Sequence, residues 1–343
     1  MVHKIIPIVL IAFSMQTLIA CCKHDANDDN KNAITEKIDG VSFVGAGSPI
    51  DGTAVNPIVN INADWATVMP LAFTEQREPN LRFNLDWQWW GERQEGIIRT
   101  CELLNEKEIR IMVKPQIWMF DGGFTGDLDM NSEEDWTAFE ERYETFILNY
   151  ATIAENANAD LFCIGTEMKN FVVTRPVFWT QLITKVKERF SGSLTYAGNW
   201  DAYKFVTFWD ELDYIGIDAY FPLSDAKTPQ VDEMIIGWQP WIDEIVNFQQ
   251  TYNKKVIFTE FGFRSLDYCA QRPWSSGSAT GVNLDAQKNA YEAFFKAVWD
   301  KDWFAGGFLW KWFDYHESAG GEDNNRFTPQ NKPAEEVIQQ WYQ

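Results

Sequence analysis

The sequence is poor in histidine and in basic side chains. Its 343 residues include 3 His, and 29 Lys+Arg stand against 50 Asp+Glu, so the formal net charge is −21 at pH 7. Because His3 and His24 precede the segment that we expect to fold, a histidine-rich metal site is excluded, and a Ser–His–Asp triad would depend on His316. The charge also disfavours nucleic acid and polyanionic substrates, since a phosphate-binding surface needs a clustered excess of Lys and Arg.

Cysteine is scarce as well, and its spacing fits neither a disulfide framework nor a zinc site. Beyond Cys21 and Cys22, the chain has Cys101, Cys163 and Cys269, an odd remainder without C-x-x-C spacing. Neither G-x-G-x-x-G nor G-x-x-x-x-G-K-[ST] follows the first expected strand, which argues against a nucleotide-binding fold. We therefore expect neither a metal nor another cofactor.

Carboxylates and indoles, in contrast, are abundant. The 50 acidic residues are accompanied by 17 Trp. The apolar C–H faces of sugars stack on aromatic rings while their hydroxyls need polar partners, so this combination suggests a protein that handles neutral sugars.

The beginning of the chain has the features of a signal peptide over residues 1–20. Lys4 supplies a positive charge, residues 5–19 are mostly apolar, and Leu18-Ile19-Ala20-Cys21 resembles the lipobox of bacterial lipoproteins. The resemblance implies cleavage before Cys21, lipidation of Cys21 and anchoring in the cell envelope, with the outer membrane favoured; an ordinary secretory signal is the alternative. Residues 21–39 are polar and poor in large apolar groups, so we expect a flexible tether there.

From residue 40 to residue 343 the pattern predicts one domain of alternating strands and helices. The expected strands are 41–46, 65–73, 110–118, 159–167, 193–200, 213–220, 254–261 and 305–312. The expected helices are 54–62, 95–108, 133–155, 175–190, 203–211, 238–252 and 285–299. Several strands are almost continuously apolar, as is typical of parallel strands covered on both faces. The alternation predicts an α/β fold, a (β/α)₈ TIM barrel, and a doubly wound open sheet is the alternative.

Two glutamates stand where chemistry occurs in such a barrel. Glu167 ends the fourth expected strand and Glu260 ends the seventh, and active sites of these barrels lie at the carboxyl ends of the strands. Either glutamate alone would most simply be a strand-end cap or half of a salt bridge. Together they provide the two carboxyl groups that glycoside hydrolysis needs, one as proton donor and the other as nucleophile or base.

Short motifs at successive strand ends make the chain resemble a known family. They are Lys114-Pro115-Gln116-Ile117-Trp118, Ile164-Gly165-Thr166-Glu167, Gly198-Asn199-Trp200, Ile215-Gly216-Ile217-Asp218-Ala219-Tyr220, Thr259-Glu260-Phe261-Gly262-Phe263-Arg264-Ser265, Pro273-Trp274 and Gly306-Gly307-Phe308-Leu309-Trp310-Lys311-Trp312. By their order and placement, the chain from about residue 41 onward resembles glycoside hydrolase family 113 of the clan A retaining glycosidases. The characterised members of that family are β-1,4-mannanases.

The resemblance implies roles for particular residues. Glu167 corresponds to the general acid/base and Glu260 to the nucleophile, with their carboxyls roughly 5–5.5 Å apart and a raised pKa for Glu167. Tyr220 corresponds to the tyrosine that contacts the nucleophile, and a core aromatic is the alternative. Most clan A enzymes have Asn directly before the acid/base, where it contacts the sugar 2-hydroxyl. Because this chain has Thr166 there, we expect its hydroxyl or the amide of Asn199 to take that role.

Tryptophans near strand ends are expected to bind sugar. Trp310 resembles the clan's tryptophan at the floor of the reactive-sugar subsite, Trp118, Trp200 and Trp274 lie near other strand ends, and Lys114 would flank the same region. Three tryptophans after the second strand fit outer subsites as well as core packing: Trp87, Trp89 and Trp90. Core packing is expected for those in helices or at helix ends: Trp136, Trp179, Trp299 and Trp303.

Taken with the resemblance, these residues predict a retaining glycoside hydrolase that cleaves β-1,4-mannosidic linkages in mannan-type polysaccharides or oligosaccharides. Its partners would be a neutral β-glycan and, through a lipid at Cys21, the membrane, and we expect a monomer that does not bind nucleic acid. One alternative is another clan A β-glycosidase, either a β-glucanase or an exo-acting enzyme. The other is a non-catalytic, glycan-binding surface lipoprotein.

Overall fold

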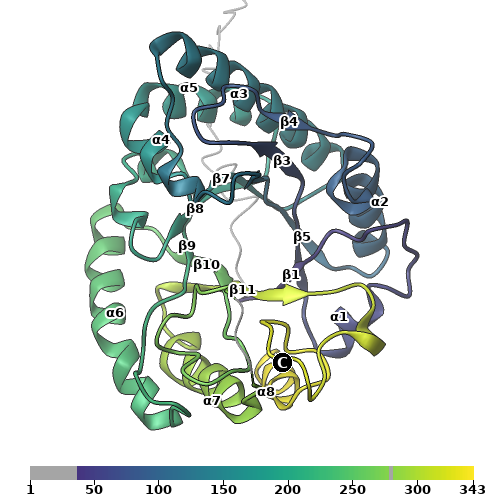
Figure 1. The fold of residues 1–343 in the computed structure, drawn as a ribbon, viewed down its shortest axis with the longest axis vertical. Coiled ribbons are helices and arrows are strands. Elements are labelled where there is room, and N and C mark those ends of the chain that lie inside the picture. Colours follow the sequence, from purple (N-terminus) through teal and green to yellow (C-terminus); the bar gives the residue numbers. More distant parts are fainter. Residues whose placement is uncertain (1–36, 278–280) are drawn as a thin grey trace, which may run out of the picture. The chain divides into compact units, whose positions relative to one another are not determined.

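The computed structural model describes residues 37–277 and 281–343, which form a closed barrel of eight parallel strands (Figure 1). The strands are β1 (Ile38–Phe43), β2 (Trp65–Val68), β5 (Arg110–Val113), β7 (Leu161–Thr166), β8 (Ser193–Asn199), β9 (Ile215–Asp218), β10 (Val256–Phe261) and β11 (Phe304–Trp312). Their order around the barrel follows the chain, and β11 closes the ring against β1. The predicted (β/α)₈ barrel is thus confirmed.

The N-terminal predictions lie almost entirely outside the described residues. This holds for the signal peptide, for the lipidated Cys21 and for the tether up to residue 36. β1 already begins at Ile38, before residue 40, where we expected the domain to start, because the side chain of Ile38 is fully buried. Within the described part of the chain, no helix combines the length and the apolar character needed to cross a membrane.

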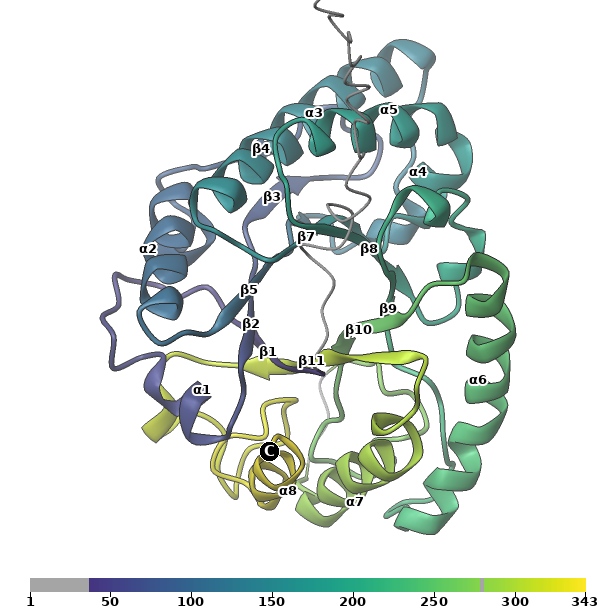
Figure 2. The ribbon, with the colours of Figure 1, turned by 180° about the vertical axis from the view of Figure 1, so that it is seen from behind.

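Helices surround the barrel (Figures 1 and 2). They are α1 (Asn56–Asn60), α2 (Gln94–Asn105), α3 (Glu133–Asn156), α4 (Lys169–Thr174), α5 (Pro176–Lys187), α6 (Val231–Tyr252), α7 (Leu284–Phe294) and α8 (Pro333–Trp341). Local sequence sets several of their ends. The Ser132 side chain accepts a hydrogen bond of 3.1 Å from the Asp135 backbone N–H at the start of α3, and acidic residues in the first turn favour the helix dipole. α6 ends at Asn253, whose φ of 50° is left-handed.

A small second sheet extends from the carboxyl ends of β2 and β5. It consists of β3 (Leu71–Thr74), β4 (Arg82–Phe83) and β6 (Gln116–Met119), in the order β4-β3-β6. The expected strands 65–73 and 110–118 are therefore two strands each, because Pro70 and Pro115 lack the N–H that would continue the barrel ladder. Pairing resumes where Gln116 donates its N–H to the Pro70 carbonyl at 3.0 Å.

The expected helix 203–211 was wrong. The structure has two single turns of 3₁₀ helix there, Tyr203–Phe205 and Trp209–Glu211. The segment is rich in aromatic and β-branched residues, which lose side-chain freedom in an α-helix. Tyr203 and Trp209 are fully buried instead, and the Trp209 indole donates to the Tyr203 carbonyl at 3.0 Å. α8, which covers residues 333–341, was not predicted.

Two layers of buried side chains hold the barrel together. One cluster, contributed by the strands, includes Trp65, Met112, Leu161, Ile257 and Phe308. A much larger cluster joins the outer faces of the strands to the helices. The free thiols of Cys101, Cys163 and Cys269 are buried within these layers, as expected for small apolar residues. The rigid frame leaves the carboxyl ends of the strands to carry the site.

Candidate active site

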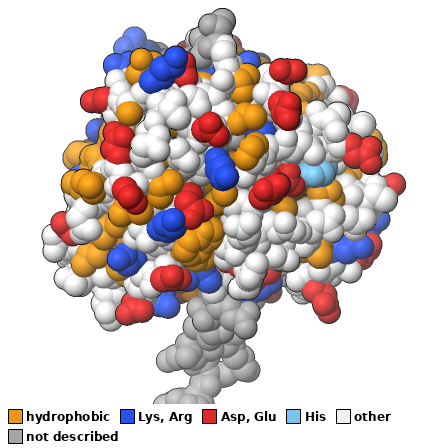
Figure 3. All heavy atoms as spheres, turned by 90° about the horizontal axis from the view of Figure 1, so that it is seen from below, with side chains coloured by type: hydrophobic (Ala, Val, Ile, Leu, Met, Phe, Trp, Pro, Cys, Tyr) orange, Lys and Arg blue, Asp and Glu red, His pale blue; other side chains and the backbone are white. Residues whose placement is uncertain are grey.

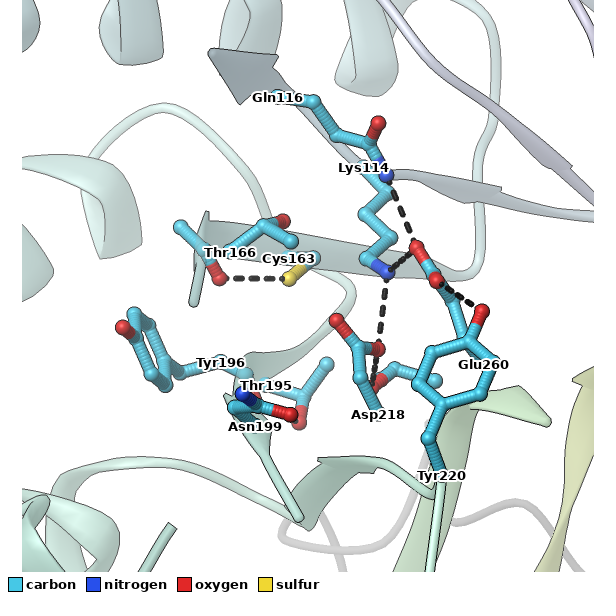
Figure 4. A network of polar contacts seen from close by, with 12 residues as sticks. Lys114, Gln116, Cys163, Thr166, Thr195, Tyr196, Asn199, Asp218, Tyr220 and Glu260 are labelled. Carbon is cyan, nitrogen blue, oxygen red and sulfur yellow. Dashed lines mark hydrogen bonds and ion pairs between the residues drawn. The ribbon is translucent and has the colours of Figure 1, made fainter. Parts of the chain in front are cut away.

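Three carboxyl groups gather at the carboxyl ends of β7, β9 and β10. Asp218 ends β9 and lies opposite Glu260 in the ladder with β10, while Glu167 directly follows the last residue of β7. Figure 4 shows Asp218 pointing toward Lys114, and Glu260 pointing toward both Lys114 and Tyr220. The structure therefore brings the two predicted glutamates to one end of the barrel, together with a third acid.

Glu260 is surrounded by hydrogen-bond donors. Its Oε1 accepts from Lys114 Nζ at 2.5 Å and from Gln116 Nε2 at 3.0 Å. Its Oε2 accepts from the Tyr220 hydroxyl at 2.7 Å, and the whole residue is 6% exposed. These contacts fix the orientation of the carboxylate, and Lys114 neutralises its negative charge.

Lys114 lies beneath the cleft rather than along it. We predicted it among the substrate-binding residues, but its side chain is fully buried and donates to Asp218 Oδ1 at 3.0 Å as well as to Glu260. Although burial lowers the pKa of Lys114, the carboxylates of Asp218 and Glu260 outweigh this effect and raise it. The charges of the two carboxylates hold the buried ammonium group in place. The structure therefore shows Lys114 bound to Glu260, where we had expected it to contact substrate.

Asp218 completes this buried group. Its Oδ1 also accepts from the Thr259 hydroxyl at 2.8 Å, whereas Oδ2 has no hydrogen-bond partner among the described residues. Burial, reinforced by the charge of Glu260 and opposed by Lys114, raises the pKa of Asp218 to about 7. Asp218 can therefore hold a proton near neutral pH in addition to those on Lys114.

Glu167 has very different surroundings. No donor in the described part of the chain bonds to its carboxyl group, and burial raises its pKa well above the usual value, assisted by the charges of Asp218 and Glu260. Its backbone is left-handed, with a φ of 54°, which is uncommon for a residue with a side chain. Two bonds stabilise this turn: the Glu167 N–H donates to the Ala197 carbonyl at 2.8 Å and the Met168 N–H to the Tyr196 hydroxyl at 2.7 Å.

The glutamates lie in the larger part of a two-part cleft. This part has a volume of about 1140 Å³ and is lined by both glutamates and by Asn199, Trp200 and Trp274, among others. The smaller part, about 480 Å³, is walled largely by aromatic and apolar side chains, including Phe73, Trp87 and Trp89. Both parts are lined by Trp118, Trp310 and Lys311, so they form one continuous cleft.

Most of the predicted substrate-binding residues line this cleft. They are Trp118, Asn199, Trp200, Tyr220, Trp274 and Trp310. The Trp118 side chain is 60% exposed, and the Trp200 ring stacks on Trp274 with centroids 5.0 Å apart. Thr166 does not line the cleft, because its hydroxyl donates to the Pro115 carbonyl at 3.3 Å. Among the tryptophans after β2, Trp90 is buried while Trp87 and Trp89 are exposed in the cleft.

In the group of hydrogen-bonded residues around Glu260 and Lys114, sequence reasoning missed two. Gln116 and Asp218 both lie inside the motifs that made the chain resemble a family, yet neither received a role. One signal could have identified Asp218: it is an acidic residue near the end of an expected strand segment, shortly before the predicted site residue Tyr220. No comparable signal marks Gln116, because its position depends on the break of the strand at Pro115.

The described residues offer no place for a metal ion by the usual ligands. In residues 37–277 and 281–343, no group of three or more His, Cys, Asp or Glu side chains is arranged to hold one. The site itself provides a carboxyl group with a raised pKa after β7 and a carboxylate held by hydrogen bonds at the end of β10, which β8 and β9 separate from β7 in the barrel. This is the equipment for substitution at an acetal carbon.

Comparisons with known proteins agree with this geometry. The model of glycoside hydrolase family 113 matches residues 52–332. Among solved structures, a β-mannanase of that family from Alicyclobacillus acidocaldarius in complex with ManMIm is 24% identical, with a TM-score of 0.78 over 90% of this chain and 97% of that one. A β-1,4-mannanase of the same family, in a complex, is 24% identical, with a TM-score of 0.76 over 90% and 99% of the two chains. No curated protein matches the chain.

Proposed function

Since the chain belongs to glycoside hydrolase family 113 and is a glycoside hydrolase, we propose that it cleaves β-1,4-mannosidic bonds with net retention. The observation that carries this proposal is the contrast between the two glutamates. Glu260 lies among donors that orient a carboxylate, and Glu167 has a raised pKa that keeps a proton on its carboxyl group. The two solved structures described as β-mannanases of this family support the choice of substrate.

In the proposed first step, Glu260 attacks the anomeric carbon and forms a covalent glycosyl-enzyme, while Glu167 gives its proton to the departing glycosidic oxygen. In the second step Glu167, now ionised, takes a proton from water. That water attacks the anomeric carbon and releases Glu260 as a carboxylate. The roles of Lys114, Gln116 and Tyr220 are to hold Glu260 in line for both displacements.

We also propose that the enzyme cleaves internal bonds. The cleft continues on both sides of the shared Trp310, with Trp87 and Trp89 in one part and Trp200 and Trp274 in the other. Aromatic platforms on both sides can hold sugar units on both sides of the scissile bond. A pocket closed at one end would instead restrict cleavage to chain ends.

The test is hydrolysis of β-mannan, glucomannan, cellulose and xylan, with sizing of products and proton NMR of the first anomer released. We expect oligosaccharides of mixed length from the two mannans, formed first as the β-anomer. A first product with the α-configuration would exclude retention, and cleavage of glucan without mannan would exclude the proposed substrate. Release of single sugars from the outset would exclude internal cleavage.

For localisation, we propose that Cys21 carries a lipid that anchors the enzyme in the outer membrane as a monomer. The motif Leu18-Ile19-Ala20-Cys21 supports this proposal. The full chain produced in bacteria should incorporate labelled palmitate and sediment with membranes, and Cys21→Ser should abolish both. Equal labelling of this variant and the parent would contradict lipidation at Cys21.

A further inference from the structure

The wall of the catalytic cleft carries basic side chains that form no ion pair with the residues that the structure describes. Lys311, Arg264 and Arg326 line the larger part of the cleft, and Lys332 is buried behind Arg326. The ion pairs within residues 37–277 and 281–343 involve other basic residues. On the face shown in Figure 3, basic side chains lie interspersed with acidic ones. Although Glu167, Asp201 and Glu260 line the same part of the cleft, none of them forms an ion pair with these cations within the described residues. In a chain with a net charge of −21, such a group of cations is a local feature that needs a reason.

Lys311 stands at the centre of this feature. It lies in β11 next to Trp310 and lines both parts of the cleft. Its Nζ is 5.3 Å from the ring centroids of Trp310 and Phe313, and it donates to no acceptor in the described residues. Burial lowers the pKa of Lys311, and the nearby charge of Arg326 lowers it further, against the attraction of Glu260. A half-buried ammonium group without an acceptor is costly unless a ligand supplies one.

Arg326 offers a second unused set of donors. Its guanidinium group is exposed in the cleft and, as far as the structure describes the chain, makes neither a hydrogen bond nor an ion pair. The backbone beneath it is fixed, because Lys332 Nζ donates to the Arg326 carbonyl at 2.9 Å and to Asn324 Oδ1 at 3.1 Å. Burial together with the charge of Arg264 lowers the pKa of Lys332 to about 7.

Arg264 adds a fixed positive charge to the same wall. Its Nη1 donates to the Gly277 carbonyl at 2.7 Å and its Nε to the Asn325 carbonyl at 3.1 Å. Burial lowers the pKa of Arg264, and the charge of Arg326 acts in the same direction. The cations thus repel one another across a surface that faces the substrate. A neutral hydroxyl can accept hydrogen bonds there, whereas an anion can also reduce the repulsion between the cations.

Building on the proposed glycosidase activity, we propose that the cleft binds a sugar unit that bears a carboxylate, a uronic acid, through Lys311 and Arg326. The planar carboxylate matches the fork of a guanidinium group, and a second cation strengthens the pair. The overall negative charge of the chain disfavours polyanions, so the ligand is a largely neutral glycan with isolated acidic units. Because Lys311 adjoins Trp310 and both glutamates share this part of the cleft, the acidic unit lies near the cleaved bond.

The test uses two oligosaccharides with a β-1,4-mannosyl backbone. One carries a single glucuronic acid unit, and in the other the same carboxyl group is reduced to an alcohol. The readout is the ratio of kcat/KM for the acidic over the reduced compound at low salt. We expect about a 10-fold preference for the acidic compound, falling toward one in Lys311→Gln, in Arg326→Gln and at high salt. Lys301→Gln, an exposed lysine outside the cleft, is the matched control and should keep the full preference.

The possible outcomes distinguish a failure of the acidic subsite from a failure of the proposed glycosidase activity. Cleavage of the reduced compound with a ratio of one or less in the parent enzyme overturns the acidic subsite and leaves the glycosidase activity intact. Equal losses on both compounds in Lys311→Gln and in Arg326→Gln also overturn it, because the charges would then act on Glu260 rather than on the ligand. If neither compound is cleaved, calorimetric binding to the parent enzyme decides: tighter binding of the acidic compound supports the subsite, and equal binding overturns it.

Discussion

Glu260 and Glu167 are the same type of residue at one end of one barrel, yet their surroundings are opposite. Glu260 accepts hydrogen bonds from Lys114, Gln116 and Tyr220, whereas no donor within the described chain reaches the carboxyl group of Glu167. Burial raises the pKa of Glu167, and the negative charges of Asp218 and Glu260 raise it further. In the proposed mechanism it is therefore the neighbours, and not the residue type, that make one carboxyl group the nucleophile and the other the proton donor.

The largest expected effect comes from removing the attacking carboxylate. Glu260→Gln keeps the shape of the side chain but loses the nucleophile, so kcat on β-mannan should fall on the order of 10⁵-fold or more. Initial rates with a sensitive reducing-end assay measure this loss, and oligosaccharide binding serves as the control for an intact cleft. A variant that keeps a tenth of the activity would show that Glu260 is not the nucleophile.

Glu167→Gln tests the other half of the comparison. Without a proton to give to the leaving oxygen, kcat should fall about 10²- to 10⁴-fold, and the loss of activity at alkaline pH should disappear from the pH profile. An alkaline limb that survives in this variant would assign the proton to another group, with Asp218 as the first candidate.

The same variant should also be more stable than the parent, with a gap that widens as pH rises. A carboxyl group whose pKa is raised by folding contributes fully to the stability of the native state below its unfolded pKa, and that contribution is lost as pH rises from the unfolded to the folded pKa. For Glu167 the loss begins near its ordinary pKa of 4.5. Each unit of raised pKa corresponds to about 1.4 kcal/mol. Urea unfolding at pH 5 and pH 8 measures the difference, and equal gaps at both values would contradict the raised pKa.

Lys114→Met should remove the positive charge that distinguishes the surroundings of Glu260 from those of Glu167. It leaves Asp218 and Glu260 buried without their cation, which should destabilise the fold by about 3–5 kcal/mol. Because Lys114 also lowers the pKa of Asp218, the acidic limb of the activity profile should move to higher pH in any folded variant. An unchanged acidic limb would mean that Lys114 has a purely structural role.

The sequence could predict the two glutamates because their evidence is local: each directly follows or ends an apolar strand of a barrel. The position of Lys114 beneath the cleft was not predicted, for the opposite reason: the evidence for it is not local. Its partner Asp218 is 104 residues away, and nothing in the motif shows whether the ammonium group points into the cleft or beneath it. The strand breaks at Pro70 and Pro115 had a local signal in the prolines themselves. The failure of residues 203–211 to form a helix depends instead on burial of Tyr203 and Trp209, which only the packed barrel determines.

Tyr220→Phe removes one donor from Glu260 and changes little else. The hydroxyl gives the 2.7 Å bond to Oε2, and bonds to charged groups contribute about 1.5–3 kcal/mol, so kcat should fall roughly 10- to 100-fold. The ring stays buried against Phe327, so the melting temperature should stay close to that of the parent. Loss of stability with unchanged kcat would assign Tyr220 to the core, the alternative that the sequence left open.

Gln116→Met should have the smallest effect on kcat. It tests whether the two carboxylate oxygens of Glu260 are held equally firmly by their hydrogen-bond donors. Gln116 shares Oε1 with Lys114, so its removal still leaves that oxygen paired, and we expect a loss in kcat of about 5-fold, for about 1 kcal/mol. Because Gln116 also lines the smaller part of the cleft, KM is measured separately to detect lost contact with substrate. A loss as large as that of Tyr220→Phe would mean that Lys114 alone does not hold Oε1, and that the orientation of Glu260 depends on neutral donors more than on charge.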